Sequence, residues 1–150
     1  MIKIRKFKKK DAKICSKIIA ETVKKENIIV KKSQEEVIKA STPEALIERM
    51  KTRKYFVCKK NNKILGIGAL NKNQVRTMYV LSNHQKGGIG TLILKRIEKE
   101  ALKNKTKKLF LYTHPKPAKF YLKNGFKTIK KLKYRGDPVI YMEKNLKCKF

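Results

Sequence analysis

The chain has 150 residues, 41% of them apolar, which fits one domain with its own hydrophobic core and excludes a disordered basic tail. Lys and Arg number 41 against 11 acidic residues, and the resulting formal charge of +30 implies an anionic partner, strong self-repulsion, or both. No apolar run of about 18 residues is present, so no membrane-spanning helix and no membrane partner are expected.

The cysteines indicate the redox environment. Cys15, Cys58 and Cys148 are odd in number and far apart, and no C-x-x-C pair occurs. This pattern argues against a zinc site or a disulfide framework, so we expect no metal and a reducing, cytoplasmic location. The N-terminus is basic but lacks the apolar stretch and the cleavage site of a signal peptide.

The N-terminal part of the chain reads as one strand followed by helices. Residues 2–7 alternate apolar and basic side chains, which predicts a half-buried strand. Asp11 is a candidate N-cap for a helix whose apolar residues recur at helical spacing over residues 14–23. Ser33 and Glu36 form a capping-box pattern, which predicts a second helix starting there.

The period of the pattern changes after a third predicted helix. Thr42 as the cap and Pro43 as the first helical residue mark the start of that helix. Residues 55–70 then contain two apolar runs around Asn61 and Asn62, which predicts a β-hairpin.

The C-terminal half alternates strands and helices. Residues 75–81 predict a strand, and a glycine-rich loop and a helix follow it. Residues 108–113 are apolar and predict a central strand. Pro117 is expected to open a short helix that Asn124 and Gly125 close.

Two final strands, over residues 126–132 and 139–146, are joined by turn residues at 136–138. The predicted fold is therefore α+β, a single domain over residues 1–150. We expect a mixed, mostly antiparallel central sheet of about six to seven strands with helices on both faces.

The glycine cluster needs a physical reason, because glycine is costly inside a helix. Gly87, Gly88 and Gly90 lie between a predicted strand and a predicted helix, where unpaired backbone N–H groups and the helix dipole attract an anion. A P-loop would need a lysine where Thr91 stands, and a dinucleotide-binding turn would need a glycine where Ile93 stands. The loop therefore favours a phosphate or pyrophosphate, but neither of these two motifs.

Two motifs carry a resemblance to a known family. Residues 85–90, QKGGIG, match the Q/R-x-x-G-x-G/A loop of the GNAT superfamily of acetyl-CoA-dependent N-acetyltransferases. Residues 118–126, AKFYLKNGF, resemble that family's A-x-x-F-Y-x-x-x-G-F signature at the expected distance downstream. The order of predicted elements also fits, so the resemblance covers nearly the whole chain. It is strongest to small, single-domain bacterial and archaeal members.

The resemblance implies a fold and a coenzyme site. The sheet would be splayed between its fourth and fifth strands, and acetyl-CoA would be the co-substrate. The loop would hold the coenzyme pyrophosphate, and the backbone of the preceding strand would bind the pantetheine arm. The implied coenzyme-binding residues are Met78, Tyr79, Val80, Gln85, Lys86, Gly87, Gly88, Ile89, Gly90 and Thr91. Lys86, Lys119 and Lys123 are candidate contacts for the coenzyme phosphates.

The resemblance implies that Tyr121 lies near the coenzyme sulfur and protonates the leaving thiolate. The general base is less evident, because no Asp or Glu occurs between Glu48 and Glu98, where many relatives carry a glutamate. His114, at the end of the predicted fifth strand, is a candidate base, and His84 is a weaker one.

Other routes for the amine proton stay open. One is ordered water, and another is a carboxylate from elsewhere in the chain, namely Glu26, Glu35 or Glu36.

The predicted function is acetyl transfer from acetyl-CoA to a primary amine by direct attack. The acceptor is a small molecule or a peptide, and the basic charge favours a neutral or anionic acceptor over a polyamine. An acetyltransferase acting on RNA or ribosome-associated substrates is the less favoured alternative, and a non-catalytic acyl-CoA-binding module is another. Dimers are common in the family. The sequence does not identify the acceptor, the base, the oligomeric state or the role of the charge.

Overall fold

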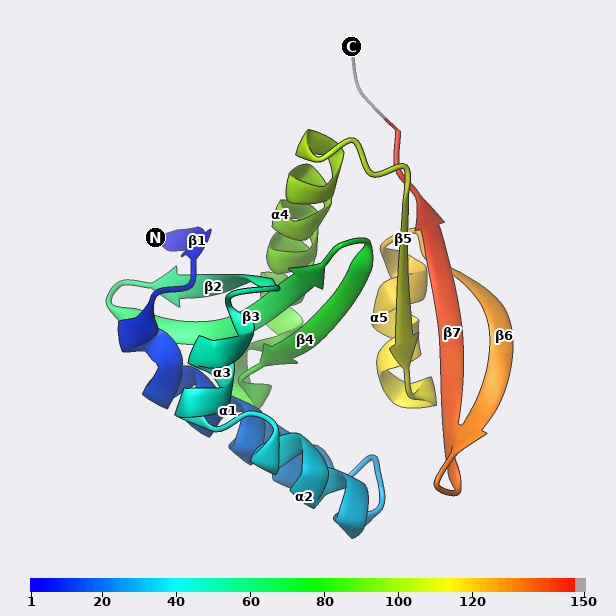
Figure 1. Ribbon diagram of the computed structural model, residues 1–150, viewed down its shortest axis with the longest axis horizontal. Helices are drawn as coiled ribbons and strands as arrows, with labels where there is room; N and C mark the ends of the chain where they lie inside the picture. Colours follow the sequence, from blue (N-terminus) through cyan, green and yellow to red (C-terminus); the bar gives the residue numbers. More distant parts are fainter. Residues whose placement is uncertain (148–150) are drawn as a thin grey trace.

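The computed structural model describes residues 1–147, and Cys148 lies outside the described residues. Within them, seven strands form one mixed sheet in the order β1-β2-β3-β4-β5-β7-β6 (Figure 1). All neighbouring strands are antiparallel except β4 and β5, which are parallel. The strands are β1 (Ile2–Lys6), β2 (Lys54–Lys60), β3 (Lys63–Asn71), β4 (Gln74–Val80), β5 (Lys108–Thr113), β6 (Lys127–Tyr134) and β7 (Asp137–Asn145).

Helices lie on both faces of this sheet, as the sequence predicts. The helices are α1 (Ala12–Glu26), α2 (Lys31–Lys39), α3 (Pro43–Arg49), α4 (Ile89–Lys103) and α5 (Pro115–Lys123), with short 3-10 helices η1 (Lys9–Asp11) and η2 (Ser82–Gly87). Helices α1 and α3 pack on one face of the β1–β4 half, and α4 packs on its opposite face (Figure 1). Helix α5 packs against β6 and β7 in the other half, on the same side as α4. None of the helices in the described part of the chain is long and apolar enough to cross a membrane.

Strand β2 shows how the sequence builds two cores. Its side chains alternate between the faces of the sheet, because successive residues of a strand point to opposite sides. Phe56 and Cys58 pack in the core formed with α4. Tyr55 and Val57 pack in the core formed with α1 and α3. Both layers are therefore anchored on one buried strand.

Most predicted elements are confirmed with small shifts of their ends. The hairpin turns at Asn61, which has a positive φ of 58°. Thr42 caps α3, since its Oγ1 accepts a hydrogen bond from the N–H of Ala45 at 3.2 Å, and Pro43 is the first helical residue. Gly125, at φ 92°, follows α5 as predicted.

The second helix begins earlier than the capping-box pattern predicts. Helix α2 starts at Lys31, and Ser33 is buried inside it with no hydrogen-bond partner for its hydroxyl among the described residues. Val30 takes the cap position in an extended conformation, and its N–H points to both carboxylate oxygens of Asp137 at 3.3 Å. The start of α2 is thus fixed by a distant carboxylate and not by the local pattern.

Helix α5 also begins earlier than predicted, at Pro115 instead of Pro117. His114 adopts the extended backbone of an N-cap, with φ −98° and ψ 162°, and a proline is well suited to the first helical position. Because Pro115 and Pro117 are both suited to the first position of a helix, the sequence is compatible with a start at either one. The shift places His114 at the junction of β5 and α5.

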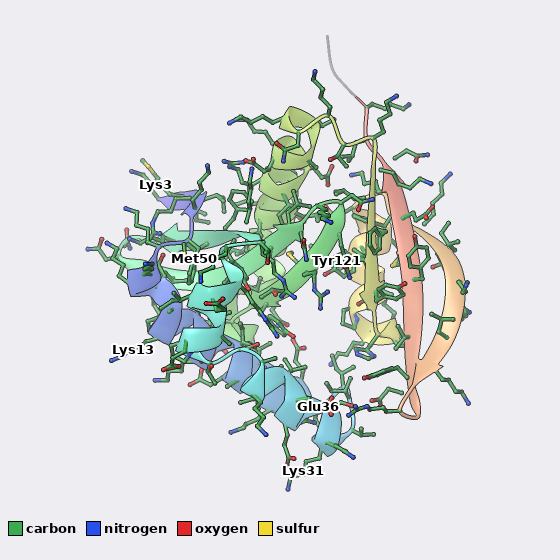
Figure 2. All side chains as sticks on the ribbon, in the orientation of Figure 1. Lys3, Lys13, Lys31, Glu36, Met50 and Tyr121 are labelled. Atoms are coloured by element: carbon green, nitrogen blue, oxygen red, sulfur yellow. The ribbon has the colours of Figure 1, made fainter. Side chains whose placement is uncertain are left out.

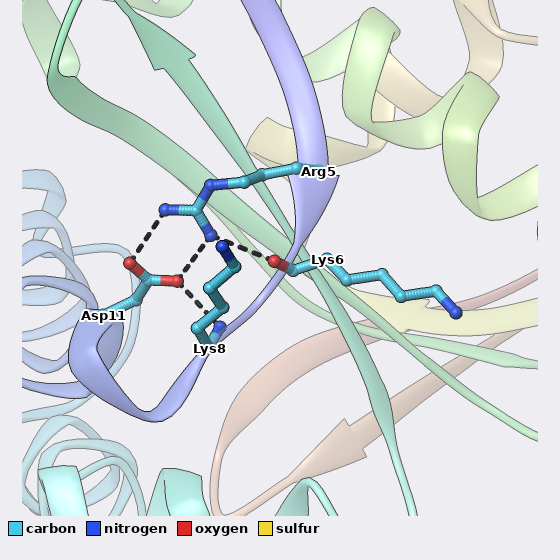
Figure 3. Close-up of polar contacts among 4 residues, drawn as sticks. All are labelled: Arg5, Lys6, Lys8 and Asp11. Carbon is cyan, nitrogen blue, oxygen red and sulfur yellow. Dashed lines mark hydrogen bonds and ion pairs between the residues drawn. The ribbon is translucent and has the colours of Figure 1, made fainter.

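Asp11 stands directly before α1, but its carboxylate does not cap that helix. It accepts hydrogen bonds from the Arg5 guanidinium at 2.7 and 2.9 Å and from the Lys8 N–H at 2.7 Å (Figure 3). Arg5 also donates to the Lys6 carbonyl oxygen at 3.0 Å. Burial opposes the charge of this carboxylate, but these hydrogen bonds outweigh it and lower the pKa of Asp11. The contacts tie β1 to the start of α1.

Candidate active site

The two parallel strands at the centre of the sheet separate soon after they meet. Strands β4 and β5 pair only at Gln74 and Phe110, where the Phe110 N–H donates to the Asn73 carbonyl at 3.0 Å. Beyond this point the two strands diverge (Figure 1). The backbone of the second half of β4 is therefore free of a strand partner on the β5 side, which confirms the predicted splay. We call this opening the fork.

A β-bulge marks the start of the free part of β4. The register shifts between Ile67 and Ala69 of β3, so that β4 carries one extra residue there. Thr77, within the bulge, has a positive φ of 55°. A β-branched residue in this conformation is strained, and such strain gathers at functional sites. The bulge redirects β4 at the fork.

A cavity of about 290 Å³ opens on the side of the fork that faces the glycine loop. We call it the coenzyme-side cavity. Its lining comes from β4, the loop, α5 and the end of α1: Thr22, Glu26, Ile28, Met78, Tyr79, Val80, Gln85, Gly90, Lys116, Pro117, Phe120 and Tyr121. The structure thus brings five of the predicted coenzyme-binding residues, Met78, Tyr79, Val80, Gln85 and Gly90, around one space.

A second cavity, of about 230 Å³, opens on the other side of the fork. We call it the acceptor-side cavity. It is lined by residues of α1, α2, β4, β5 and α5, among them Arg76, Tyr112 and His114. Six residues line both cavities, and these are Glu26, Ile28, Met78, Tyr79, Pro117 and Tyr121. The two cavities therefore meet where Tyr121 lies.

A larger hollow of about 520 Å³ lies between α1 and the β2–β3 hairpin, with Arg5 and Asp11 in its lining. It shares no lining residue with the two cavities at the fork. Volume alone would favour this hollow or one of about 550 Å³ on α2. The glycine loop, the strand splay and Tyr121, however, all lie at the fork. The fork is therefore the better candidate for the active site.

The glycine loop forms the start of α4. Gly88 has a φ of 78°, which favours glycine, and Ile89 begins the helix. A Cβ on Gly87 or Gly88 would meet nothing within 4 Å, so both glycines border open space. The first N–H groups of α4 have no partner inside the helix, and the helix dipole adds positive charge there. This end of α4 is a suitable site for a pyrophosphate.

Gly90 has a different role from the other two glycines. A Cβ at this position would lie 3.0 Å from Cζ of Phe120, so the missing side chain allows α4 and α5 to approach closely. Phe120 and Gly90 both line the coenzyme-side cavity. The loop motif and the aromatic motif of the sequence therefore meet in space.

Gln85 links the loop to α1. Its Nε2 donates to Oε1 of Glu26 at 2.6 Å and to the Val80 carbonyl at 3.0 Å. Glu26 lines both cavities, whereas Glu36 is paired with Arg135 and Glu35 lies in a separate hollow on α2. Of the three distant acids that the sequence offers, only Glu26 reaches the fork.

Tyr121 is held rigidly by its neighbours. Its ring packs edge-on against Phe120 and Phe126, with centroid distances of 5.1 and 5.7 Å, and only 7% of the residue is exposed. Burial, with a smaller contribution from Tyr79, raises the pKa of Tyr121. Burial and the charge of Glu26 raise the pKa of Tyr79 to about 12. Tyr121 therefore keeps its proton at neutral pH. Figure 2 shows Tyr121 between the ribbons of β4 and β5.

The two histidines are placed differently. His114 lines the acceptor-side cavity, and its Nδ1 lies 3.0 Å from the Pro138 carbonyl oxygen. A carbonyl only accepts, so Nδ1 carries the proton of this contact, and Nε2 of the neutral ring keeps a free lone pair. His84 belongs to η2 and lines a separate hollow with Glu21 and Lys25. His84 is thus not brought to the fork.

Among the lysines, Lys116 lines the coenzyme-side cavity, although sequence reasoning did not select it. Lys116 lies between Pro115 and Pro117. The helix start predicted from the sequence was Pro117, which left Lys116 outside the predicted helix. Lys119 and Lys123 are exposed on α5 and line neither cavity at the fork. The side chain of Lys86 lies outside the described residues.

The fork, with the glycine loop beside one of its cavities, is a suitable site for a phosphate-bearing ligand. The family model of the acetyltransferase (GNAT) domain matches residues 19–146, and the chain therefore belongs to the GNAT acetyltransferases. Acetyl-CoA is the acetyl donor of this family, and the protein is an acetyl-CoA-dependent N-acetyltransferase. No curated protein sequence matches the chain significantly.

Solved structures show the same fold at low sequence identity. A GCN5-related N-acetyltransferase from Rhodopseudomonas palustris is 17% identical, with a TM-score of 0.85 over 96% of this chain and 95% of that one. PaiA N-acetyltransferase from Thermoplasma acidophilum, solved in complex with coenzyme A, is 24% identical, with a TM-score of 0.82 over 97% and 99%. YncA from Salmonella typhimurium, solved with acetyl-CoA, is 18% identical, with a TM-score of 0.74 over 97% and 94%.

Proposed function

We propose that the protein transfers an acetyl group from acetyl-CoA to the primary amine of a small or peptide acceptor by direct attack. The observation that carries this proposal is the meeting of two cavities at Tyr121, one bordered by the glycine loop and the other by His114. A donor and an acceptor that enter from opposite sides would meet there. Holding two reactants in this way removes much of the entropic barrier.

The coenzyme-side cavity fits the donor by its chemistry. The free N–H groups at the start of α4 suit a pyrophosphate, and the unpaired edge of β4 offers backbone groups to an amide-containing arm. Lys116 adds a cation to the same wall. When bound, acetyl-CoA would supply an activated acetyl thioester. The residues proposed to hold it are the loop from Gln85 to Thr91 and the β4 segment from Met78 to Val80.

The reaction needs two proton transfers that the site residues can perform. The amine nitrogen bonds to the thioester carbonyl carbon, and the carbon–sulfur bond breaks. We assign Tyr121 as the donor of a proton to the departing thiolate, because its hydroxyl is protonated at neutral pH and lies where the cavities meet. We assign His114 Nε2 as the acceptor of the amine proton, because the Nδ1 contact with Pro138 fixes the suitable tautomer.

The charge of the site favours a neutral or anionic acceptor. Arg76 lines the acceptor-side cavity, and Glu26 is the acid that lines it. The formal charge of +30 repels polycations from the whole molecule. The two described cysteines, Cys15 and Cys58, are buried and form no disulfide. This agrees with a protein that functions in the reducing cytoplasm.

The test is a kinetic screen that follows release of the coenzyme thiol from acetyl-CoA. The panel contains amino acids, dipeptides, neutral amines and spermidine. Turnover with a neutral or anionic amine supports the proposal, and a strong preference for spermidine contradicts its electrostatic part. Saturable binding of acetyl-CoA without turnover on any amine would favour a non-catalytic acyl-CoA-binding module.

A further inference from the structure

One face of the β5–β7–β6 half of the sheet is uncovered and carries a cluster of aromatic rings. Helix α5 packs on the opposite face, and among residues 1–147 no helix lies over β5, β7 and β6 on this one (Figure 1). Phe110 and Tyr112 of β5 and Tyr141 of β7 gather there, with ring centroids 5.1 to 6.2 Å apart. Tyr112 is 53% exposed, so the cluster is open to solvent. We call it the ring face.

Lysines share the ring face, because side chains of paired residues point to the same side. Lys130 pairs with Tyr141, and Lys127 pairs with Glu143, which lies on this face. The charge of Glu143 is countered by Lys108 Nζ at 3.4 Å and by the Tyr141 hydroxyl, which donates to it at 2.6 Å. That hydrogen bond, followed by burial, raises the pKa of Tyr141 to about 12, so the ring is uncharged. The face therefore combines neutral rings with a surplus of cations.

An arginine cluster lies across the acceptor-side cavity from the ring face. Arg76 of β4 lines that cavity, as does Tyr112 of the ring face. Burial lowers the pKa of Arg76, and so does repulsion from Arg53 and Arg49. Within residues 1–147 none of these three arginines forms an ion pair with a carboxylate. Arg49 donates to the Ala40 carbonyl at 2.8 Å, and Arg49 and Arg53 add positive charge near Arg76. Arg76, at the wall of the cavity, is therefore a suitable contact for an anion.

From this juxtaposition we propose that the ring face and the arginine cluster together dock single-stranded nucleic acid, which crosses the mouth of the acceptor-side cavity. Bases stack on Phe110, Tyr112 and Tyr141, because every base has a planar face that suits an aromatic ring. Phosphates contact the arginines and the lysines. A duplex would not fit in this way, since its bases are stacked on one another and their planar faces are covered.

A second copy of the chain is a poorer occupant of this face. Two molecules with a charge of +30 repel each other. Strand β6, at the edge of the sheet, is exposed along its whole length and carries Lys127, Lys130, Lys131 and Lys133. Lysines on an edge strand oppose pairing with another strand. The same charges attract a polyanion.

The test is fluorescence anisotropy with labelled single-stranded RNA and DNA oligonucleotides of mixed sequence, each about 12 nucleotides long. A protein with this large positive charge binds any polyanion. The test therefore compares the affinities of matched variants. Tyr112→Leu/Tyr141→Leu removes two rings, keeps apolar volume and leaves the charge unchanged. We expect its affinity for both oligonucleotides to fall about tenfold or more. Far-UV circular dichroism and thermal unfolding verify that the variant is folded.

The charge arm compares two variants that each lose two cations. Arg53→Gln/Arg76→Gln should weaken binding more than Lys3→Gln/Lys13→Gln, whose lysines lie on the far side of the molecule (Figure 2). It should also reduce the salt dependence, by about 0.7 in slope for each lost phosphate contact. Single Tyr141→Leu and Arg76→Gln variants serve if a double variant does not fold.

Equal affinity of the wild type and the ring variant would overturn the proposal, and so would equal losses in the two charge variants. The binding would then come from diffuse charge alone. A concentration-dependent dimer in sedimentation that the ring variant abolishes would also overturn it, in favour of a second copy. These readouts need no turnover, so the proposed acetyl transfer can fail without affecting them.

Discussion

Nδ1 of His114 lies 3.0 Å from the carbonyl oxygen of Pro138, which joins the start of α5 to the start of β7 beside the acceptor-side cavity. The contact fixes the imidazole so that Nε2 is the nitrogen with a free lone pair. A base that is held in one tautomer needs no rearrangement before it accepts a proton. The role of His114 can therefore be tested by removing the ring.

The His114→Ala variant should lower kcat about 100-fold, in the range typical of general base catalysis. The affinity for acetyl-CoA should change little, because His114 lines only the acceptor-side cavity. Added imidazole should restore part of the rate. His84→Ala is the control, because His84 lies outside both cavities. Full activity of His114→Ala would move the role of the base to Glu26 or to water.

The Tyr121→Phe variant should lower kcat by about 100- to 10,000-fold while leaving the affinity for acetyl-CoA nearly unchanged. The substitution removes the hydroxyl and keeps the ring that packs between Phe120 and Phe126. Release of the coenzyme thiol gives kcat, and titration calorimetry gives the affinity. An unchanged kcat would show that the thiolate leaves without a proton from Tyr121.

Tyr55 supplies a matched Tyr→Phe control and a prediction of its own. Its hydroxyl is buried and has no hydrogen-bond partner among the described residues, and Tyr55 lines neither cavity at the fork. Tyr55→Phe should keep wild-type kcat and raise the free energy of unfolding by about 1 kcal/mol, because a buried polar group without a partner is unfavourable. Urea denaturation measures the change. A clear destabilisation would indicate that the hydroxyl has a partner.

Glu100 should make stability depend on pH. Its carboxylate is 2% exposed and contacts Lys54 at 2.7 Å and Arg96 at 3.3 Å. The hydrogen bond from Lys54, opposed by burial, holds the pKa of Glu100 below its ordinary value of 4.5. Its stabilising contribution is therefore complete above that value and is lost as the pH falls through the lower folded-state pKa.

The Glu100→Gln variant should accordingly lose about 1–3 kcal/mol of unfolding free energy near neutral pH. The difference from wild type should shrink as the pH falls below 4.5, because the wild-type carboxyl then becomes protonated as well. Urea denaturation over a pH series measures it. Glu21→Gln, on the exposed surface of α1, controls for the loss of one charge. A difference that persists unchanged in acid would contradict the ion-pair explanation.

The sequence predicts turns and helix ends well, because these features depend on a few neighbouring residues. The hairpin at Asn61, the cap at Thr42 and the end of α5 at Gly125 were all predicted from the residues in place. The fold and the family also follow, since alternating periods and two spaced motifs point to them. The fork itself was expected only from the family resemblance.

Tertiary contacts decide what the sequence did not predict. The start of α2 depends on Asp137, 107 residues away from Val30. Thr77 carries no local signal for the positive φ that the bulge requires. Glu26 lines both cavities because the end of α1 packs beside β4 and α5. The rings on one face, Phe110, Tyr112 and Tyr141, also come together only because distant segments pack side by side.

The most direct test of the central claim is calorimetric titration with acetyl-CoA of the wild type, Gly88→Glu and Gly136→Glu. Gly88 and Gly136 have similar φ values, 78° and 85°, and a side chain at either would enter open space. Both variants therefore carry similar backbone strain and the same added charge, and they differ in whether the charge stands in the glycine loop. We predict saturable one-to-one binding by the wild type and by Gly136→Glu, and at least about tenfold weaker binding by Gly88→Glu. Equal binding by all three proteins, or none by the wild type, would contradict the assignment of the loop as the pyrophosphate site.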